Sequence, residues 1–165
     1  KLGFALLGLG YALLPAASLL WLRAASDQGG WVVLWMMIIV WSMDTGAYFA
    51  GKNIGGPKMA PRISPNKTWA GLIGGTVTAV ILGAVAAYYF GFRVNFLILL
   101  PLAALLAIWS QIGDLAESAL KRHFKVKDSG AIIPGHGGIM DRVDGVIFAA
   151  PAIALFLYLL GDGRL

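Results

Sequence analysis

Five long apolar stretches constrain this chain more than any other feature of its sequence. They cover about residues 2–22, 31–51, 68–90, 94–124 and 143–160. A helix needs roughly 20 residues to cross the hydrocarbon core of a bilayer, and each stretch is close to that length or longer. A helix also satisfies its own backbone hydrogen bonds in lipid, and the strict alternation of a barrel strand is absent. We therefore predict an all-α, polytopic integral membrane protein, with about five transmembrane helices in one domain over residues 1–165.

The composition supports lipid as the natural solvent. Of the 165 residues, 59% are hydrophobic and 13% are charged, and the mean hydropathy is +0.78. Soluble domains carry about a quarter charged residues. The net charge of +5 lies in loops between apolar stretches, a pattern that follows the membrane rule for Lys and Arg and predicts no nucleic-acid partner. The absence of cysteine excludes a disulfide framework and thiolate chemistry.

The loop charges predict the orientation in the membrane. One side carries Lys1, Lys52, Lys58, Arg62, Lys67, Lys121, Arg122, Lys125, Lys127 and Arg142, and the other carries Arg23, Arg93 and Arg164. The positive-inside rule places the first side in the cytoplasm. The two loops of that side, about 52–67 and 125–140, are long and rich in Gly, Pro and Lys, as functional loops often are. We predict a multi-pass protein of the cell inner (plasma) membrane with its active site facing the cytoplasm.

The start of the sequence predicts a fragment. The chain begins with Lys1, and no small-residue cleavage site follows its first apolar stretch, so a signal peptide is not indicated. We expect the chain to be the C-terminal, site-bearing part of a longer protein.

Carboxylates occur in three predicted spans, at a depth where lipid should be. Asp44 lies roughly 12 Å below the cytoplasmic end of the second span. Asp114 and Glu117 lie one turn apart in the fourth span, and Asp141 and Asp144 repeat that spacing at the start of the fifth. A charge at the centre of a membrane helix costs about 2.5–3.5 kcal/mol. A metal, a basic partner or a water-filled cavity must compensate this cost.

We predict that these carboxylates share a polar cavity on the cytoplasmic side. Hard oxygen ligands and the lack of cysteine favour Mg²⁺ over zinc or copper, and a second cation is left open. The structural alternative is a set of buried salt bridges, for example between Asp141 or Asp144 and Arg142 or Lys121. Basic residues beside carboxylates suggest an anionic ligand that binds with a metal, as a nucleoside triphosphate does.

Two loop segments are candidate phosphate-binding elements. Ser64 or Asn66 can cap the third span, whose N-terminus would then offer free N–H groups to a phosphate. The alternative is a helix cap with no further role. The segment containing His136, Gly137 and Gly138 allows close approach of the backbone to a ligand. Gly71 and Gly75, inside the third span, have the spacing of helix-packing residues.

One segment of the sequence resembles a known family signature. Its defined positions are Ser118, Leu120, Lys121, Arg122, Lys127, Asp128, Gly130, Pro134, His136, Gly137, Gly138, Asp141, Arg142 and Asp144. This pattern closely resembles the signature of phosphatidate cytidylyltransferases, also called CDP-diacylglycerol synthases. The segments from Asp44 to Gly51 and from Ser64 to Trp69 are similar to the same family. The second departs from it at Ala70, where an acidic residue is common in the family, so this chain has no carboxylate at that position.

The resemblance implies a magnesium-dependent enzyme of phospholipid biosynthesis that forms a homodimer. Its substrates would be CTP and phosphatidate in the bilayer, among other membrane lipids, and its products CDP-diacylglycerol and pyrophosphate. Asp114 and Asp141 are then the first expected metal ligands and catalytic residues, with Asp44, Glu117 and Asp144 as further ligands or their supports. Expected phosphate-binding residues are Lys67, Lys121, Arg122, Lys127 and Arg142, of which Lys121, Arg122 and Lys127 are also expected to be catalytic. Expected substrate contacts are Arg62, Ser64, Asn66, His136, Gly137 and Gly138.

The sequence is also compatible with two other functions. An ion-coupled transporter or channel would also use intramembrane carboxylates, although it would not explain two long basic loops on one side. A structural membrane subunit is the other alternative. An enzyme that consumes CDP-diacylglycerol would resemble a different motif, which this sequence lacks.

Overall fold

The computed structural model describes residues 2–126 and 140–160, with side chains described except at positions 2, 4–7 and 140–142. Five helices account for most of this part of the chain: α1 (Leu2–Ala24), α2 (Gly29–Asn53), α3 (Trp69–Tyr89), α4 (Phe96–His123) and α5 (Met140–Leu160). Their bounds match the five predicted stretches to within a few residues. The predicted all-α class is confirmed at the level of a mostly helical protein.

Four of the described helices are long and apolar enough to cross a membrane. They are α2, α3, α4 and the part of α5 from Val143 to Leu160. Large apolar side chains cover the outer surface, such as Leu97, which is 81% exposed, and Ile81, which is 57% exposed. Such a surface suits lipid and not water. The chain is a multi-pass membrane protein, and a crossing by α1 stays a prediction.

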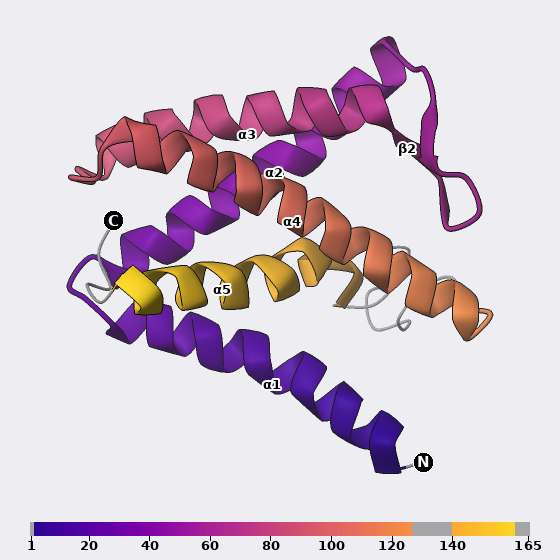
Figure 1. The fold of residues 1–165 in the computed structure, drawn as a ribbon, viewed down its shortest axis with the longest axis horizontal. Coiled ribbons are helices and arrows are strands. Elements are labelled where there is room, and N and C mark those ends of the chain that lie inside the picture. Colours follow the sequence, from indigo (N-terminus) through magenta and orange to yellow (C-terminus); the bar gives the residue numbers. More distant parts are fainter. Residues whose placement is uncertain (1, 127–139, 161–165) are drawn as a thin grey trace.

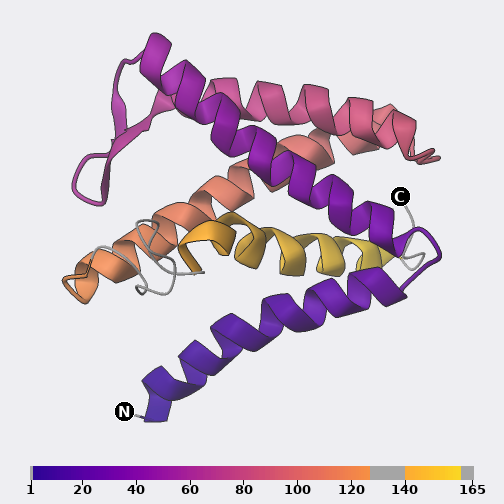
Figure 2. The same cartoon turned by 180° about the vertical axis from the view of Figure 1, so that it is seen from behind.

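Helix α2 lies at the centre of the bundle. Its side chains Trp35, Met36, Ile39 and Met43 are completely buried, and it crosses behind α4 and α5 in Figure 1 and in front of them in Figure 2. The indole N–H of Trp35 donates a 2.8 Å hydrogen bond to the carbonyl oxygen of Gly83, on α3. This bond satisfies the one polar atom of a large buried side chain.

Glycine allows α2 and α3 to pack closely. A Cβ atom added to Gly75 would lie 2.6 Å from the carbonyl oxygen of Met43, and one added to Gly71 would lie 2.9 Å from that of Ala47. Neither position has room for a side chain without movement of the α2 backbone. The predicted packing role of these two glycines is confirmed.

A short hairpin, absent from the sequence-based prediction, joins α2 to α3. Strand β1 (Lys58–Ala60) pairs antiparallel with β2 (Ser64–Thr68), with Lys58 opposite Thr68 and Ala60 opposite Ser64. Gly55 and Gly56 precede it with φ angles of 69° and 93°, a region that glycine enters without strain. The hairpin projects from the end of the bundle where α2 ends and α3 begins (Figure 1).

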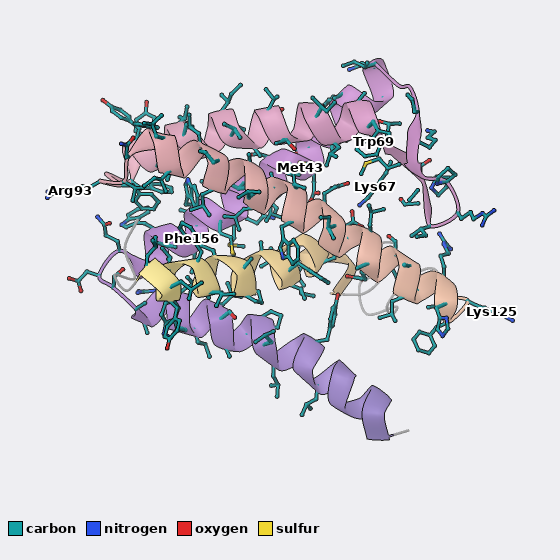
Figure 3. The ribbon with its side chains drawn as sticks, viewed as in Figure 1. Met43, Lys67, Trp69, Arg93, Lys125 and Phe156 are labelled. Atoms are coloured by element: carbon teal, nitrogen blue, oxygen red, sulfur yellow. The ribbon has the colours of Figure 1, made fainter. Side chains whose placement is uncertain are left out.

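The two ends of the bundle differ in the loops that they hold. The hairpin, the N-terminus of α1, the end of α4 and the start of α5 lie at one end, and the α3–α4 connection lies at the other (Figures 1 and 2). Figure 3 shows Lys67 and Lys125 toward the first end and Arg93 at the opposite end. The helices therefore group the basic loops as the loop charges predicted.

Candidate functional site

Strand β2 leads directly into α3, and this junction positions Lys67. The side-chain oxygen of Thr68 accepts a 3.0 Å hydrogen bond from the backbone N–H of Gly71 and so caps α3. The prediction that Ser64 or Asn66 caps this helix is wrong, because both lie inside β2, before the cap position. The extended backbone of the strand then continues up to the helix, and Lys67 is directed toward α4 (Figure 3).

Lys67 forms an ion pair with Asp114. Its Nζ atom lies 2.5 Å from the Oδ2 atom of Asp114, and the two side chains are 15% and 26% exposed. The hydroxyl of Ser118, one turn further along α4, donates a longer bond of 3.4 Å to the other carboxylate oxygen. The charge of Asp114 is therefore compensated by a cation from a neighbouring element. The Asp114 side chain is partly exposed, whereas the ammonium nitrogen of Lys67 is buried.

The ion pair borders a hollow of about 260 Å³ between α2, α3, α4 and the hairpin. Its lining residues are Asp44, Ala47, Tyr48, Asn66, Lys67, Thr68, Gly71, Leu72, Gln111 and Asp114. Two carboxylates, one ammonium group, two side-chain amides and two hydroxyl-bearing side chains, Tyr48 and Thr68, thus share this space with small and apolar residues. The carboxylates outnumber the ammonium group, so this lining suits an anionic ligand that binds together with a divalent cation and carries hydrogen-bonding groups.

A second polar group lies one turn beyond Asp114 on α4. Glu117, whose side chain is 4% exposed, pairs with Lys121 at 3.3 Å. The hydroxyl of Tyr11, on α1, donates a 3.2 Å hydrogen bond to its other carboxylate oxygen. Among the described side chains, Lys121 forms an ion pair with Glu117. The predicted alternative of salt bridges that involve Asp141 or Arg142 concerns side chains outside the described residues.

Asp144 brings a fourth carboxylate from α5. One of its oxygens accepts a 2.7 Å hydrogen bond from the backbone N–H of Gly145. Its carboxyl group lies within electrostatic range of those of Asp114, Glu117 and Asp44. Carboxylates from α2, α4 and α5 therefore influence one another, but among the described residues only Asp44 and Asp114 line the hollow. One cavity shared by all of these carboxylates stays a prediction.

The carboxylates of this region are the right kind of ligand for a divalent cation, but those described do not lie close enough together to hold one ion. Among the described side chains, four carboxylates lie in this region and Lys67 and Lys121 form ion pairs with two of them; carboxylate oxygen is the donor that Mg²⁺ prefers. Within residues 2–126 and 140–160, however, no three His, Cys, Asp or Glu side chains lie close enough to hold one ion together. The side chain of Asp141, a predicted ligand, lies outside the described residues, so the ligand set stays a prediction.

The remaining predicted site residues fall into two groups. Ser64 and Arg62 belong to the hairpin, with Ser64 half-buried and Arg62 exposed at its turn. The Nε atom of Arg122 lies 3.5 Å from the carbonyl oxygen of Ile63, which links the end of α4 to the same turn. Lys127, His136, Gly137 and Gly138, and the side chains of Asp141 and Arg142, lie outside the described residues.

The structure adds three residues that sequence reasoning did not select. Gln111 is 5% exposed and lines the hollow one turn before Asp114, and its place in an apolar stretch at helical spacing from Asp114 was an available signal. Thr68 is the actual cap of α3. Tyr11 contacts Glu117 across a separation of 106 residues, and no local pattern indicates such a contact.

Comparison with known proteins places this arrangement in a family. A family model described as the cytidylyltransferase family matches residues 1–160. The phosphatidate cytidylyltransferase of Brucella suis biovar 1 (strain 1330) is 49% identical, over 93% of this chain and 57% of that protein. That of Bacillus subtilis (strain 168) is 44% identical, over 84% of this chain and 50% of that protein. The chain spans about half the length of these curated relatives. The match over residues 1–160 shows that the chain belongs to the cytidylyltransferase family.

Proposed function

We propose that this chain is the site-bearing part of a phosphatidate cytidylyltransferase, which converts CTP and phosphatidate into CDP-diacylglycerol and pyrophosphate. The hollow bordered by the Lys67–Asp114 pair is the observation that supports the proposal most directly. It combines a cation with carboxylates inside a membrane protein, as a site for a metal-bound triphosphate must. The names of the relatives supply the reaction.

The chemical step is a displacement at phosphorus. A phosphate oxygen of phosphatidate attacks the α-phosphorus of CTP, a new P–O bond forms, and the bond from the α-phosphorus to the oxygen bridging to the β-phosphorus breaks. Pyrophosphate leaves with that oxygen and its electron pair. The second pKa of a phosphate monoester is about 6, so the attacking oxygen is already ionised near neutral pH. The site therefore requires no strong general base.

The main barrier is electrostatic, because two anions must meet and the leaving group gains charge. Lys67 borders the hollow and can exchange part of its contact with Asp114 for a phosphate oxygen. Asn66 and Gln111 line the same space and offer amide N–H donors. Fixed donors directed at developing charge are a large source of catalysis in such transfers. Lys121, Arg122, Lys127 and Arg142 are proposed as further phosphate-binding residues, as are Arg62, Ser64 and the segment His136–Gly138.

Asp114 is proposed to hold Mg²⁺ together with Asp141, while Asp44 and Asp144 act as further ligands or support these two. Glu117 is the weakest of the proposed ligands, since it already contacts Lys121 and Tyr11. A bound Mg²⁺ supplies charge neutralisation for the triphosphate. The protein is proposed to lie in the cell inner membrane, with its site open to the cytoplasm. It is also proposed to act as a homodimer.

The test uses the full-length protein purified in detergent, with labelled CTP. Pyrophosphate should appear only when both phosphatidate and Mg²⁺ are present, and Asp114→Asn should lower the rate at least about 100-fold. Asp27→Asn is the matched control, because Asp27 lies in the α1–α2 connection, outside the site. Failure of the wild-type protein to release pyrophosphate would contradict the proposal. Ion flux through vesicles containing such an inactive protein would favour the transporter alternative.

A further inference from the structure

An apolar groove of about 800 Å³ lies between α1, α4 and α5, on a different side of α4 from the hollow described above. Leu14 and Pro15 of α1, Trp109 of α4, and Phe148, Pro151 and Leu155 of α5 line it. The volume is within the roughly 300–1,000 Å³ typical of ligand sites. In both views α1 lies close to α5 near the start of α2 and diverges from it toward the N-terminus (Figures 1 and 2). The groove occupies this region of divergence.

Tyr11 connects the groove to the polar site. Its ring lines the groove and contacts Phe148 edge-on, with ring centroids 6.3 Å apart. Its hydroxyl donates to Glu117, which pairs with Lys121. Glu117 lies in turn within electrostatic range of Asp144. One residue therefore contacts the apolar space on one side and the group of carboxylates and cations on the other.

This continuity indicates the chemistry of the ligand. A molecule that occupies both regions must have a hydrocarbon tail for the groove and an anionic head for the cations and metal ligands. Membrane phospholipids with a small phosphate head have this form, and a groove between lipid-exposed helices is reached directly from the bilayer. Leu14 and Leu155 line the groove and are also 60% and 58% exposed on the outer surface of the helices, which the bilayer would contact.

We propose that this groove binds an acyl chain of the phosphatidate substrate. The phosphate of that lipid is thereby directed toward the cluster of carboxylates and lysines around Glu117 and Asp114. The inference rests on the proposed function and adds to it the place where the lipid tail lies. The Tyr11–Glu117 contact marks the boundary between tail and head. Tail contacts in the groove would improve the orientation of the attacking phosphate, since positioning contributes strongly to this kind of transfer.

Two glycines of α1 provide a matched pair for the test. Gly10 lines the groove, whereas Gly8 is exposed on the same helix and is not part of the lining. A Cβ atom added to either glycine meets nothing within 4 Å, so both accept a side chain. Gly10→Phe should place a ring in the groove, and Gly8→Phe should add the same ring to the outer surface of α1.

The measurement compares dioleoyl phosphatidate with dihexanoyl phosphatidate as substrates of the full-length protein in mixed micelles. Gly10→Phe should raise the KM for the dioleoyl substrate about tenfold, the size expected of an overpacking clash. The KM for CTP and the turnover of the dihexanoyl substrate should stay at wild-type values, as should all constants of Gly8→Phe. An unchanged dioleoyl KM in Gly10→Phe would overturn the groove assignment alone. A wild-type protein inactive on both lipids would overturn the proposed function as well.

A second pair of variants guards against misfolding of the first. Leu155→Trp fills the groove from α5, and Ile81→Trp makes the same kind of change at a similarly exposed position on α3, 57% against 58%. A phosphatidate with a photoreactive group at the end of one acyl chain should label the peptides that contain Leu14 or Phe148, in competition with unlabelled phosphatidate. Labelling confined to other helices would contradict the inference, and would favour occupation of the groove by another segment of the full chain.

Discussion

The ammonium group of Lys67, at the end of strand β2, lies 2.5 Å from a carboxylate oxygen of Asp114, in α4. The pair joins the hairpin to a membrane helix and borders the hollow that we assign to the triphosphate. Asp114 is thereby supplied with an opposite charge. A ligand with phosphate groups and a divalent cation would satisfy both partners at once, the cation binding Asp114 and a phosphate binding Lys67.

Removal of the Lys67 charge should affect both activity and folding. Lys67→Met should lower turnover about 100-fold or more, because a donor to the phosphates is lost. It should also lower the unfolding temperature, since the partly buried Asp114 loses its partner. Lys58→Met, at an exposed position of the same hairpin, should leave both quantities unchanged. Recovery of the unfolding temperature, but not of activity, is expected in Lys67→Met/Asp114→Asn; wild-type turnover of Lys67→Met would refute this role.

The carboxylates of α2 and α5 should determine the affinity for magnesium. Asp44→Asn and Asp144→Asn should each raise the Mg²⁺ concentration that gives half-maximal activity by about 10–100-fold, the usual effect of altering a metal's supporting groups. The titration is best done at saturating CTP, with Asp27→Asn as the control. A proportional loss of maximal rate at an unchanged magnesium requirement would instead assign these residues a role apart from the metal.

Close packing of α2 against α3 should depend on Gly75. Gly75→Ala places a methyl group 2.6 Å from the carbonyl oxygen of Met43 and 3.0 Å from the Cβ atom of Ala47. We expect a loss of about 1–3 kcal/mol in the free energy of unfolding, as is typical of overpacking. Gly8→Ala is the matched control, because nothing lies within 4 Å of its added Cβ atom. Equal thermal or denaturant midpoints for the two variants would argue against close contact at Gly75.

The Thr68 cap of α3 should affect substrate binding as well as stability. Thr68→Ala removes the acceptor of the Gly71 N–H group and should cost about 1 kcal/mol of stability. Because Thr68 follows Lys67 directly, the first turn of α3 and the Lys67 side chain should lose their fixed position together. The KM for CTP should therefore rise in Thr68→Ala, while Thr68→Ser, which keeps the hydroxyl, should resemble wild type. An increase of similar size in both variants would show that the methyl group, and not the cap, is important.

The helices and much of the candidate site can be predicted from the sequence, because both follow from the cost of placing polar groups in lipid. Each apolar stretch must satisfy its backbone within itself in lipid, so its length and bounds can be read along the chain. The free-energy cost of a charge at that depth likewise identifies Asp44, Asp114, Glu117 and Asp144 from the sequence. Gln111 was not predicted. The same argument applies to it less strongly, because burying an amide in lipid costs less free energy than burying a charge.

The sequence by itself determined that this chain forms membrane helices, that its basic loops belong to one end, and which polar side chains must find partners. Only the tertiary structure decided what those partners are. Lys67 pairs with Asp114 because a hairpin turns the chain back beside α4. Tyr11 reaches Glu117 across 106 residues because α1 packs against α5, which in turn packs against α4. Such choices depend on how helices pack against one another. Packing is set by non-local contacts. The spacing of Gly71 and Gly75 indicates a packing face on α3, but no local pattern specifies that the α2 backbone is what meets it.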